Sequence, residues 1–173
     1  MTLSTRRATV ADTEAVSRLA IESFVAKFGH LYPPEDLRYY LHHAYSLDAI
    51  ERSIADAAST TWLLFDNDAL AGFALIGQAS LPHEDIQPGD GEIKRLYLDP
   101  SITGRGLGSH LMSVVLDDLL QDGPRTLWLG VYSDNIDAQR FYARHGFTRV
   151  GSYEFPVGDT RDLEFIFRRP PSY

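Results

Sequence analysis

The spacing of apolar side chains predicts three helices in the first third of the chain. They are expected at about 12–28, from Pro33 to Tyr45, and at about 47–58, because apolar residues recur there at every third or fourth position. A short strand at about 5–9 precedes the first helix. Thr9 and Asp12 have the spacing of a capping box and mark the start of that helix.

The pattern of the remaining two thirds predicts strands interrupted by two helices. The strands are expected at 60–66, 70–79, 92–99, 126–132, 147–155 and 162–168, and the helices at 105–120 and 135–146. Asn67 and Asp68 join the first two of these strands in a hairpin. The strand, helix and strand between 92 and 132 require a parallel crossover. We therefore predict an α/β (α+β) fold whose mixed sheet carries helices on both faces.

The composition is that of a single globular domain spanning residues 1–173. Apolar residues make up 44% of the chain, but no apolar run approaches the length of about 20 residues that spans a bilayer. The N-terminus lacks the apolar segment of a secretory signal, so we expect a cytoplasmic protein with no membrane partner. A formal net charge of −8 argues against a nucleic-acid partner and favours cationic small molecules.

Cysteine and histidine usage restricts the chemistry further. The chain has no cysteine, which excludes disulfides, thiolate metal sites and a cysteine nucleophile. His42 and His43 are adjacent on a predicted helix, so their side chains point apart, and no third ligand has a matching spacing. We therefore expect no metal site.

A glycine-rich turn carries the first chemical signal. Gly104, Gly106 and Gly108 lie between the predicted strand at 92–99 and the next helix. Glycines let a ligand approach the backbone, and the first amides of a helix bind anions such as phosphate. No Gly-Lys-Ser/Thr follows the turn and the dinucleotide fingerprint is weak, which disfavours ATP and NAD. A tight connection without a ligand is the alternative.

A second motif, N-x-x-A-x-x-F-Y-x-x-x-G-F, runs from Asn135 to Phe147. Asn135 is expected to cap the helix, and Phe141 and Tyr142 lie in its middle. Together with the glycine turn, this motif resembles the GNAT superfamily of acyl-CoA-dependent N-acetyltransferases over essentially the whole chain. The resemblance implies a mostly antiparallel sheet that is splayed between its fourth and fifth strands.

The resemblance also implies a site for acetyl-CoA as cosubstrate. The residues that it assigns to the CoA pyrophosphate, through their backbone amides, are Thr103, Gly104, Arg105, Gly106, Gly108 and Ser109. Those that it assigns to the pantetheine arm are Leu96, Tyr97, Leu98 and Asn135. Thr103 departs from the arginine or glutamine usual at its position, which removes a side-chain contact. Arg105 either attracts the phosphates or is a solvated residue at the start of the helix.

Two residues are implied in catalysis. Tyr142 matches the family tyrosine near the thioester sulfur, where a phenol can protonate the departing CoA thiolate.

The acceptor must first lose a proton, because an alkylamine of pKa about 10.4 is almost fully protonated at pH 7. Glu92 matches the position of the base in many family members; an exposed strand glutamate, with water taking the proton, is the alternative. No serine or histidine is arranged as a covalent nucleophile, which favours direct attack of the amine on the thioester.

The resemblance places the acceptor between the first two helices and the splayed strands. Candidate lining residues are the aromatic Phe24, Phe28, Tyr32, Tyr39 and Tyr45 and the acidic Glu35, Asp36, Glu84, Asp85 and Asp90. The chain is also similar to PaiA-type polyamine acetyltransferases, which implies a small cationic amine such as spermidine. A non-catalytic CoA-binding regulatory module and an acetyltransferase acting on a protein or an aminoglycoside stay open as alternatives. The resemblance also allows a homodimer.

Overall fold

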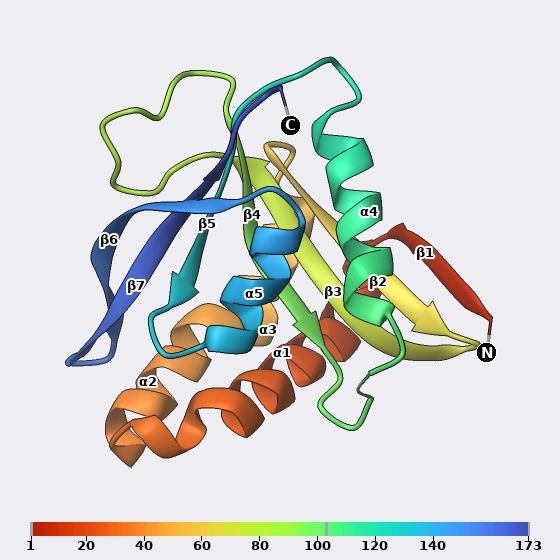
Figure 1. The fold of residues 1–173 in the computed structure, drawn as a ribbon. Helices are drawn as coiled ribbons and strands as arrows, with labels where there is room; N and C mark the ends of the chain where they lie inside the picture. The colour runs from red at the N-terminus through yellow and green to blue at the C-terminus, as the bar shows by residue number, and fades with distance from the viewer. Residues whose placement is uncertain (1, 103, 173) are drawn as a thin grey trace.

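A computed structural model describes residues 2–102 and 104–172, which form one mixed sheet with helices on both faces (Figure 1). The elements are β1 (Leu3–Arg7), α1 (Thr13–Phe28), α2 (Pro34–Tyr45), α3 (Leu47–Ala55), β2 (Ser59–Asp66), β3 (Ala69–Gln78), β4 (Gly91–Leu98), α4 (Leu107–Leu119), β5 (Leu127–Tyr132), α5 (Ile136–Arg144), β6 (Thr148–Val157) and β7 (Thr160–Arg169). Short 3₁₀ turns at Val10–Asp12 and Gly29–Leu31 flank α1. The predicted order of helices and strands is confirmed.

Three predicted boundaries are displaced, each for a local reason. β1 lies two residues earlier than predicted, because Leu3 pairs with Asp66 at the end of β2. α3 ends at Ala55 because Asp56 is extended and accepts a hydrogen bond from the Ala58 amide. α4 begins at Leu107 rather than at 105, because the residue before it, Gly106, has a left-handed backbone.

The strand order is β1-β2-β3-β4-β5-β7-β6, and the pair β4 and β5 is parallel while the other pairs are antiparallel. The parallel pair is joined at two positions, Gly91 with Leu127 and Glu92 with Trp128. Beyond them the two strands diverge (Figure 1). The splay between the fourth and fifth strands is therefore confirmed.

A bulge in β4 changes which way its residues face. Leu75 of β3 pairs with Arg95 and Ile76 pairs with Ile93, so Lys94 is the extra residue. On the far side of the bulge, Tyr97 packs on the core beneath α1–α3, whereas Ile93 belongs to the core beneath α4. Strict alternation would put residues 93 and 97 on one face. The bulge therefore brings Glu92 onto the same face as Tyr97.

Each face of the sheet has its own hydrophobic core. α4 covers one face, where Leu111, Met112 and Val115 are fully buried. On the other face, α1, α2 and α3 enclose a core that contains Phe24, Tyr45 and Phe73, for example. Among the residues that the structure describes, no helix is long and apolar enough to cross a bilayer.

The predicted capping box is found at the start of the 3₁₀ turn that leads into α1. The Thr9 amide donates to Asp12 Oδ2 at 2.8 Å. The same carboxylate receives both Arg6 guanidinium nitrogens, at 2.8 Å each, which joins β1 to the helix. The hydrogen bonds from Arg6 lower the pKa of Asp12 to about 2, and the Thr9 amide adds to that effect.

We predict that Asp12→Asn lowers the free energy of unfolding by about 1–2 kcal/mol at neutral pH, because it removes the charge that pairs with Arg6. Arg6 is half-exposed, so solvent screens the pair and limits the loss. The stabilisation is fully present above the unfolded-state carboxyl pKa of about 4. It is lost as the pH falls toward the folded-state value of about 2. Denaturant titrations of both proteins at neutral pH and near pH 2 measure the change.

The matched control is Glu14→Gln, which removes the largely exposed ion pair between Glu14 and Arg18. We expect that loss to stay below about 0.5 kcal/mol. A loss for Asp12→Asn that is no larger than this, or that is unchanged near pH 2, contradicts the stabilising role of Asp12.

Candidate active site

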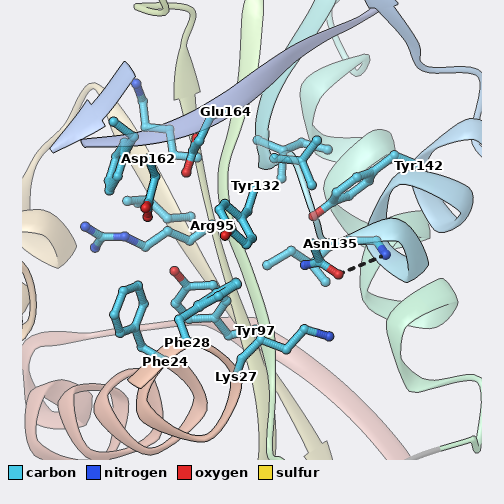
Figure 2. Close-up of a pocket in the computed structure, with 18 of the residues that line it drawn as sticks. Phe24, Lys27, Phe28, Arg95, Tyr97, Tyr132, Asn135, Tyr142, Asp162 and Glu164 are labelled. Carbon is cyan, nitrogen blue, oxygen red and sulfur yellow. Dashed lines mark hydrogen bonds between the residues drawn. The ribbon is translucent and has the colours of Figure 1, made fainter. Parts of the chain in front are cut away.

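A cavity of about 680 Å³ lies where β4 and β5 diverge. Its walls come from α1, β4, β5, α5 and the β6–β7 hairpin. Figure 2 shows Asn135 and Tyr142 on one side of it and Asp162 and Glu164 on the other. The side chains of Phe24, Phe28 and Lys27 approach from α1.

The glycine turn leads into this cavity at the start of α4. Gly104 and Gly106 have φ angles of 71° and 74°, a conformation that favours glycine. The first helical hydrogen bond runs from the His110 amide to the Gly106 carbonyl, so the amides before His110 are available to a ligand. Gly108 lines the cavity. The structure thus leaves the amides at the start of α4 without helical partners, and their contact with a phosphate stays a prediction.

Thr103 and Arg105 are two of the residues predicted to bind phosphate at the turn. Thr103 lies outside the described residues. Arg105 forms an ion pair with Asp66 at the end of β2, with 2.8 Å between Nη1 and Oδ2. Its guanidinium therefore has a partner within the protein, and a phosphate contact from Arg105 would compete with Asp66.

The edge of β4 offers unpaired backbone groups to the cavity. The Asp99 amide donates to the Ala71 carbonyl on the β3 side. Because backbone groups alternate in direction along a strand, Leu96 and Leu98 direct theirs toward β5, which has already diverged. Ser23 of α1 donates to the Leu98 carbonyl at 3.0 Å. An extended ligand has room to pair with this edge at Leu96 and at the Leu98 amide. The backbone groups of Tyr97, also predicted for pantetheine, face β3 instead.

α5 carries Asn135 and Tyr142 at the opposite wall. Asn135 caps the helix, with Oδ1 accepting from the Ala138 amide at 3.3 Å, which confirms the predicted cap. The phenolic oxygen of Tyr142 points into the cavity (Figure 2). Burial, together with the negative charge of Glu164, raises the pKa of Tyr142 to about 12. Tyr142 is therefore held neutral, as a proton donor must be.

Glu92 lines the cavity but has partners within the protein. Its side chain is 8% exposed, and Oε2 accepts from the Ser80 amide at 2.7 Å and from Lys94 Nζ at 3.3 Å. The prediction of an exposed strand glutamate as the alternative is wrong, since Glu92 is buried. Its role as a base stays a prediction.

The strand β7 brings two carboxylates that the sequence did not single out. Asp162 accepts a hydrogen bond from the Tyr32 hydroxyl, and Glu164 Oε2 accepts one from Tyr153 at 2.6 Å. Both carboxylates line the cavity. The sequence signal was their spacing of two residues in the strand 162–168, which puts them on one face.

Three of the aromatic residues predicted for the acceptor channel line the cavity, and the channel itself stays a prediction. Phe24, Phe28 and Tyr32 line the cavity, whereas Tyr45 is fully buried beneath it. None of the acidic residues proposed for the channel is among the residues that line it. Asp36 and Asp90 have structural roles: Asp36 accepts from the Thr160 hydroxyl in the β6–β7 hairpin, and Asp90 accepts from Trp128 Nε1. Within the described part of the chain no cluster of metal-ligating side chains occurs.

Known proteins are similar to this chain in sequence and in fold. Residues 16–147 match the family described as the acetyltransferase (GNAT) family. An uncharacterised N-acetyltransferase of the pepI 3′ region of Lactobacillus delbrueckii subsp. lactis is 32% identical over 90% of this chain and 88% of its own. A spermidine N(1)-acetyltransferase of Thermoplasma acidophilum is 26% identical over 98% of both chains.

A solved structure provides the same comparison for the fold. The PaiA N-acetyltransferase from Thermoplasma acidophilum, in complex with coenzyme A, superposes with a TM-score of 0.77 at 23% identity. The match covers 98% of this chain and 99% of that one. The arrangement of strands and helices around the splay is therefore that of a known acetyltransferase.

Proposed function

The chain belongs to the acetyltransferase (GNAT) family, and we propose that it transfers the acetyl group of acetyl-CoA to a small cationic amine such as a polyamine. One observation carries the proposal: a single cavity joins the glycine-rich start of α4 and the partly buried Tyr142 on one side to carboxylates on the other. The first side suits CoA, and the second suits a cationic amine.

CoA would lie along the wall formed by β4, α4 and α5. The amides of Gly104, Arg105, Gly106, Gly108 and Ser109 would bind the pyrophosphate. The pantetheine arm would pair with the edge of β4 at Leu96 and Leu98 and pass Asn135. This placement would bring the thioester to the middle of the cavity, near the Tyr142 hydroxyl, which points into it.

The reaction is a direct attack of the neutral amine on the thioester carbonyl. A C–N bond forms, the C–S bond breaks, and the CoA thiolate receives a proton from Tyr142; that proton is replaced by the one that the attacking nitrogen loses as it becomes an amide. The amide of Leu98, directed into the gap, can stabilise the negative charge that develops on the carbonyl oxygen. One proton is released overall, because a protonated amine becomes a neutral amide.

The cavity also suits an acceptor with more than one positive charge. Asp162 and Glu164 are two residues apart on one face of β7, a separation of about 6.8 Å along the strand. The three- or four-carbon spacers of polyamines bridge such a distance. The spermidine acetyltransferase among the relatives supports the same class of acceptor.

The proposal is tested by measuring CoA-thiol release from acetyl-CoA with spermidine, spermine, lysine peptides, amino acids and an aminoglycoside. We expect turnover with the polyamines and competition by spermidine for any weaker amine. Turnover with peptides or the aminoglycoside alone would keep the chemistry and change the acceptor. CoA binding without turnover of any amine would instead support a regulatory module.

We predict that Gly108→Ala weakens CoA binding about tenfold without destabilising the protein. Gly108 is helical, so alanine suits its backbone, and the added Cβ lies 3.5 Å from Phe141 in ordinary contact. The methyl group would narrow the cavity where the cofactor must approach the helix start. Calorimetric titration with CoA and thermal unfolding measure the two effects.

Gly106→Ala is the comparison variant, since its φ of 74° strains any other residue. We expect that variant to lose both stability and CoA affinity. Unchanged CoA affinity in Gly108→Ala would contradict a cofactor passing at this point.

We predict that Tyr142→Phe lowers kcat about 100-fold and changes the affinity for CoA by less than about threefold. With a pKa of about 12, the phenol stays protonated throughout the neutral range, so the loss should be the same from pH 6 to pH 9. Steady-state kinetics with a polyamine measure it. A loss that varies with pH over this range argues against a donor that stays protonated.

A further inference from the structure

We infer that Glu164 forms the subsite for the ammonium group of the acceptor and takes its proton before the amine attacks the thioester. The inference rests on the proposed acetyl transfer and names the residue that makes the amine reactive. Glu164 lies in the centre of β7, paired with Tyr132 of β5 and Tyr153 of β6. Its side chain points into the cavity across from Tyr142 (Figure 2).

The sheet leaves room for this carboxylate. Gly130 of β5 lies beside it, and a Cβ there would come within 3.0 Å of Glu164 Oε2 and 2.8 Å of the Tyr153 hydroxyl. Real side chains do not tolerate such distances, so any larger residue at 130 would displace the pair. The neighbouring Leu129 and Val131 face the opposite core, beneath α4. Gly130 thus keeps open the position where Glu164 meets the cavity.

Glu164 differs from Glu92 in its partners. Among the described residues, no Lys, Arg or His nitrogen lies within ion-pair distance of the Glu164 carboxylate, whereas Lys94 is 3.3 Å from Glu92. Three cations, Lys27, Lys94 and Arg95, line the same cavity; Lys94 is paired with Glu92, and Arg95 is placed over the Tyr45 ring. Keeping a carboxylate partly buried without a cation is unfavourable. A protonated amine supplies that cation.

The groups around Glu164 affect its proton affinity from several elements. Burial raises the pKa of Glu164, the hydrogen bond from Tyr153 lowers it in part, and the charge of Asp162 raises it. Its own charge acts in turn on Tyr32 of the α1–α2 connection, Tyr40 of α2, Tyr97 of β4 and Tyr142 of α5. A carboxylate with a raised pKa is a stronger base than an ordinary one.

Proton transfer to Glu164 makes the acceptor amine nucleophilic. The acceptor enters as R–NH₃⁺ and binds the ionised Glu164; the proton moves to the carboxylate, leaving R–NH₂ and neutral Glu164. Burial lowers the pKa of the acceptor amine and raises the pKa of Glu164, so the difference between the two pKa values becomes smaller. The amine nitrogen then bonds to the acetyl carbon, the C–S bond breaks, and the second proton lost by the nitrogen replaces the one that Tyr142 gives to the thiolate. Glu164 later releases its proton to solvent.

The test compares Glu164→Gln with wild type in polyamine acetylation. We expect kcat/KM for the amine to fall about 100-fold, with a raised KM, while CoA affinity and thermal stability stay unchanged. The acid limb of the kcat/KM profile should lie above the ordinary glutamate range in wild type and disappear in the variant. Persistence of that limb in Glu164→Gln would overturn the inference.

Two further variants serve as matched comparisons. Glu154→Gln removes the same charge from the exposed face of β6, next to Tyr153, and should leave kcat/KM and its acid limb unchanged. Glu92→Gln tests the other carboxylate: loss of the acid limb in that variant, with the limb retained in Glu164→Gln, would assign the base to Glu92. A wild type inactive with every amine would overturn the proposed function itself.

Tyr153→Phe tests the subsite without removing the carboxylate. Tyr153 is a positioning residue, whose hydroxyl stabilises the ionised form of Glu164. Its removal raises the Glu164 pKa further, so the acid limb should move to higher pH. A purely structural role predicts a change in stability with no movement of the limb, and that result would contradict the inference.

Discussion

Parallel pairing between β4 and β5 stops after two positions, and the candidate active site depends on that short contact. Gly91 allows it, because a Cβ at this position would lie 2.9 Å from Leu127 Cδ2. Asp90 reinforces it by accepting from the buried Trp128 indole at 2.8 Å. The two strands are held together at one end and separate toward the other. Asp90, which the sequence suggested for the acceptor channel, thus helps to hold together the strand pair that opens into the cavity.

The divergence of the strands gives each wall of the cavity a different chemistry. On the β4 side, backbone groups of Leu96 and Leu98 lack a neighbouring strand and can pair with an extended ligand. On the β5 side, β7 and β6 continue the sheet and contribute carboxylates and phenols. Cofactor and acceptor can therefore approach the same point from different elements.

The features that depend on neighbouring residues in the chain could be predicted from the sequence. The order of elements, the capping box at Thr9 and the helix cap at Asn135 follow from spacing and residue type. The splay came from resemblance to a family and not from periodicity. The cofactor contacts stay a prediction, which rests on the backbone groups of a glycine turn whose sequence is informative.

The side chains that face the cavity could not be predicted, because they depend on pairing between strands that are distant in the sequence. Which carboxylates face the cavity depends on the bulge at Lys94 and on the register of β7 against β5. Arg105 meets Asp66 across 39 residues of chain, and Tyr153 meets Glu164 across a strand pair. The alternating pattern of β7 showed that Asp162 and Glu164 share a face. It could not show which face the cavity would be on.

Glu164 and Tyr142 are coupled through the cavity, and this coupling gives the proposed reaction its order. While Glu164 is ionised, its negative charge helps to hold the Tyr142 proton in place. When Glu164 takes the proton of the acceptor amine, that charge is removed and Tyr142 becomes a stronger acid. The thiolate leaves only after the amine has attacked, so the gain in acidity comes before the step that uses it. Both proton transfers therefore depend on the arrival of a protonated amine at Glu164.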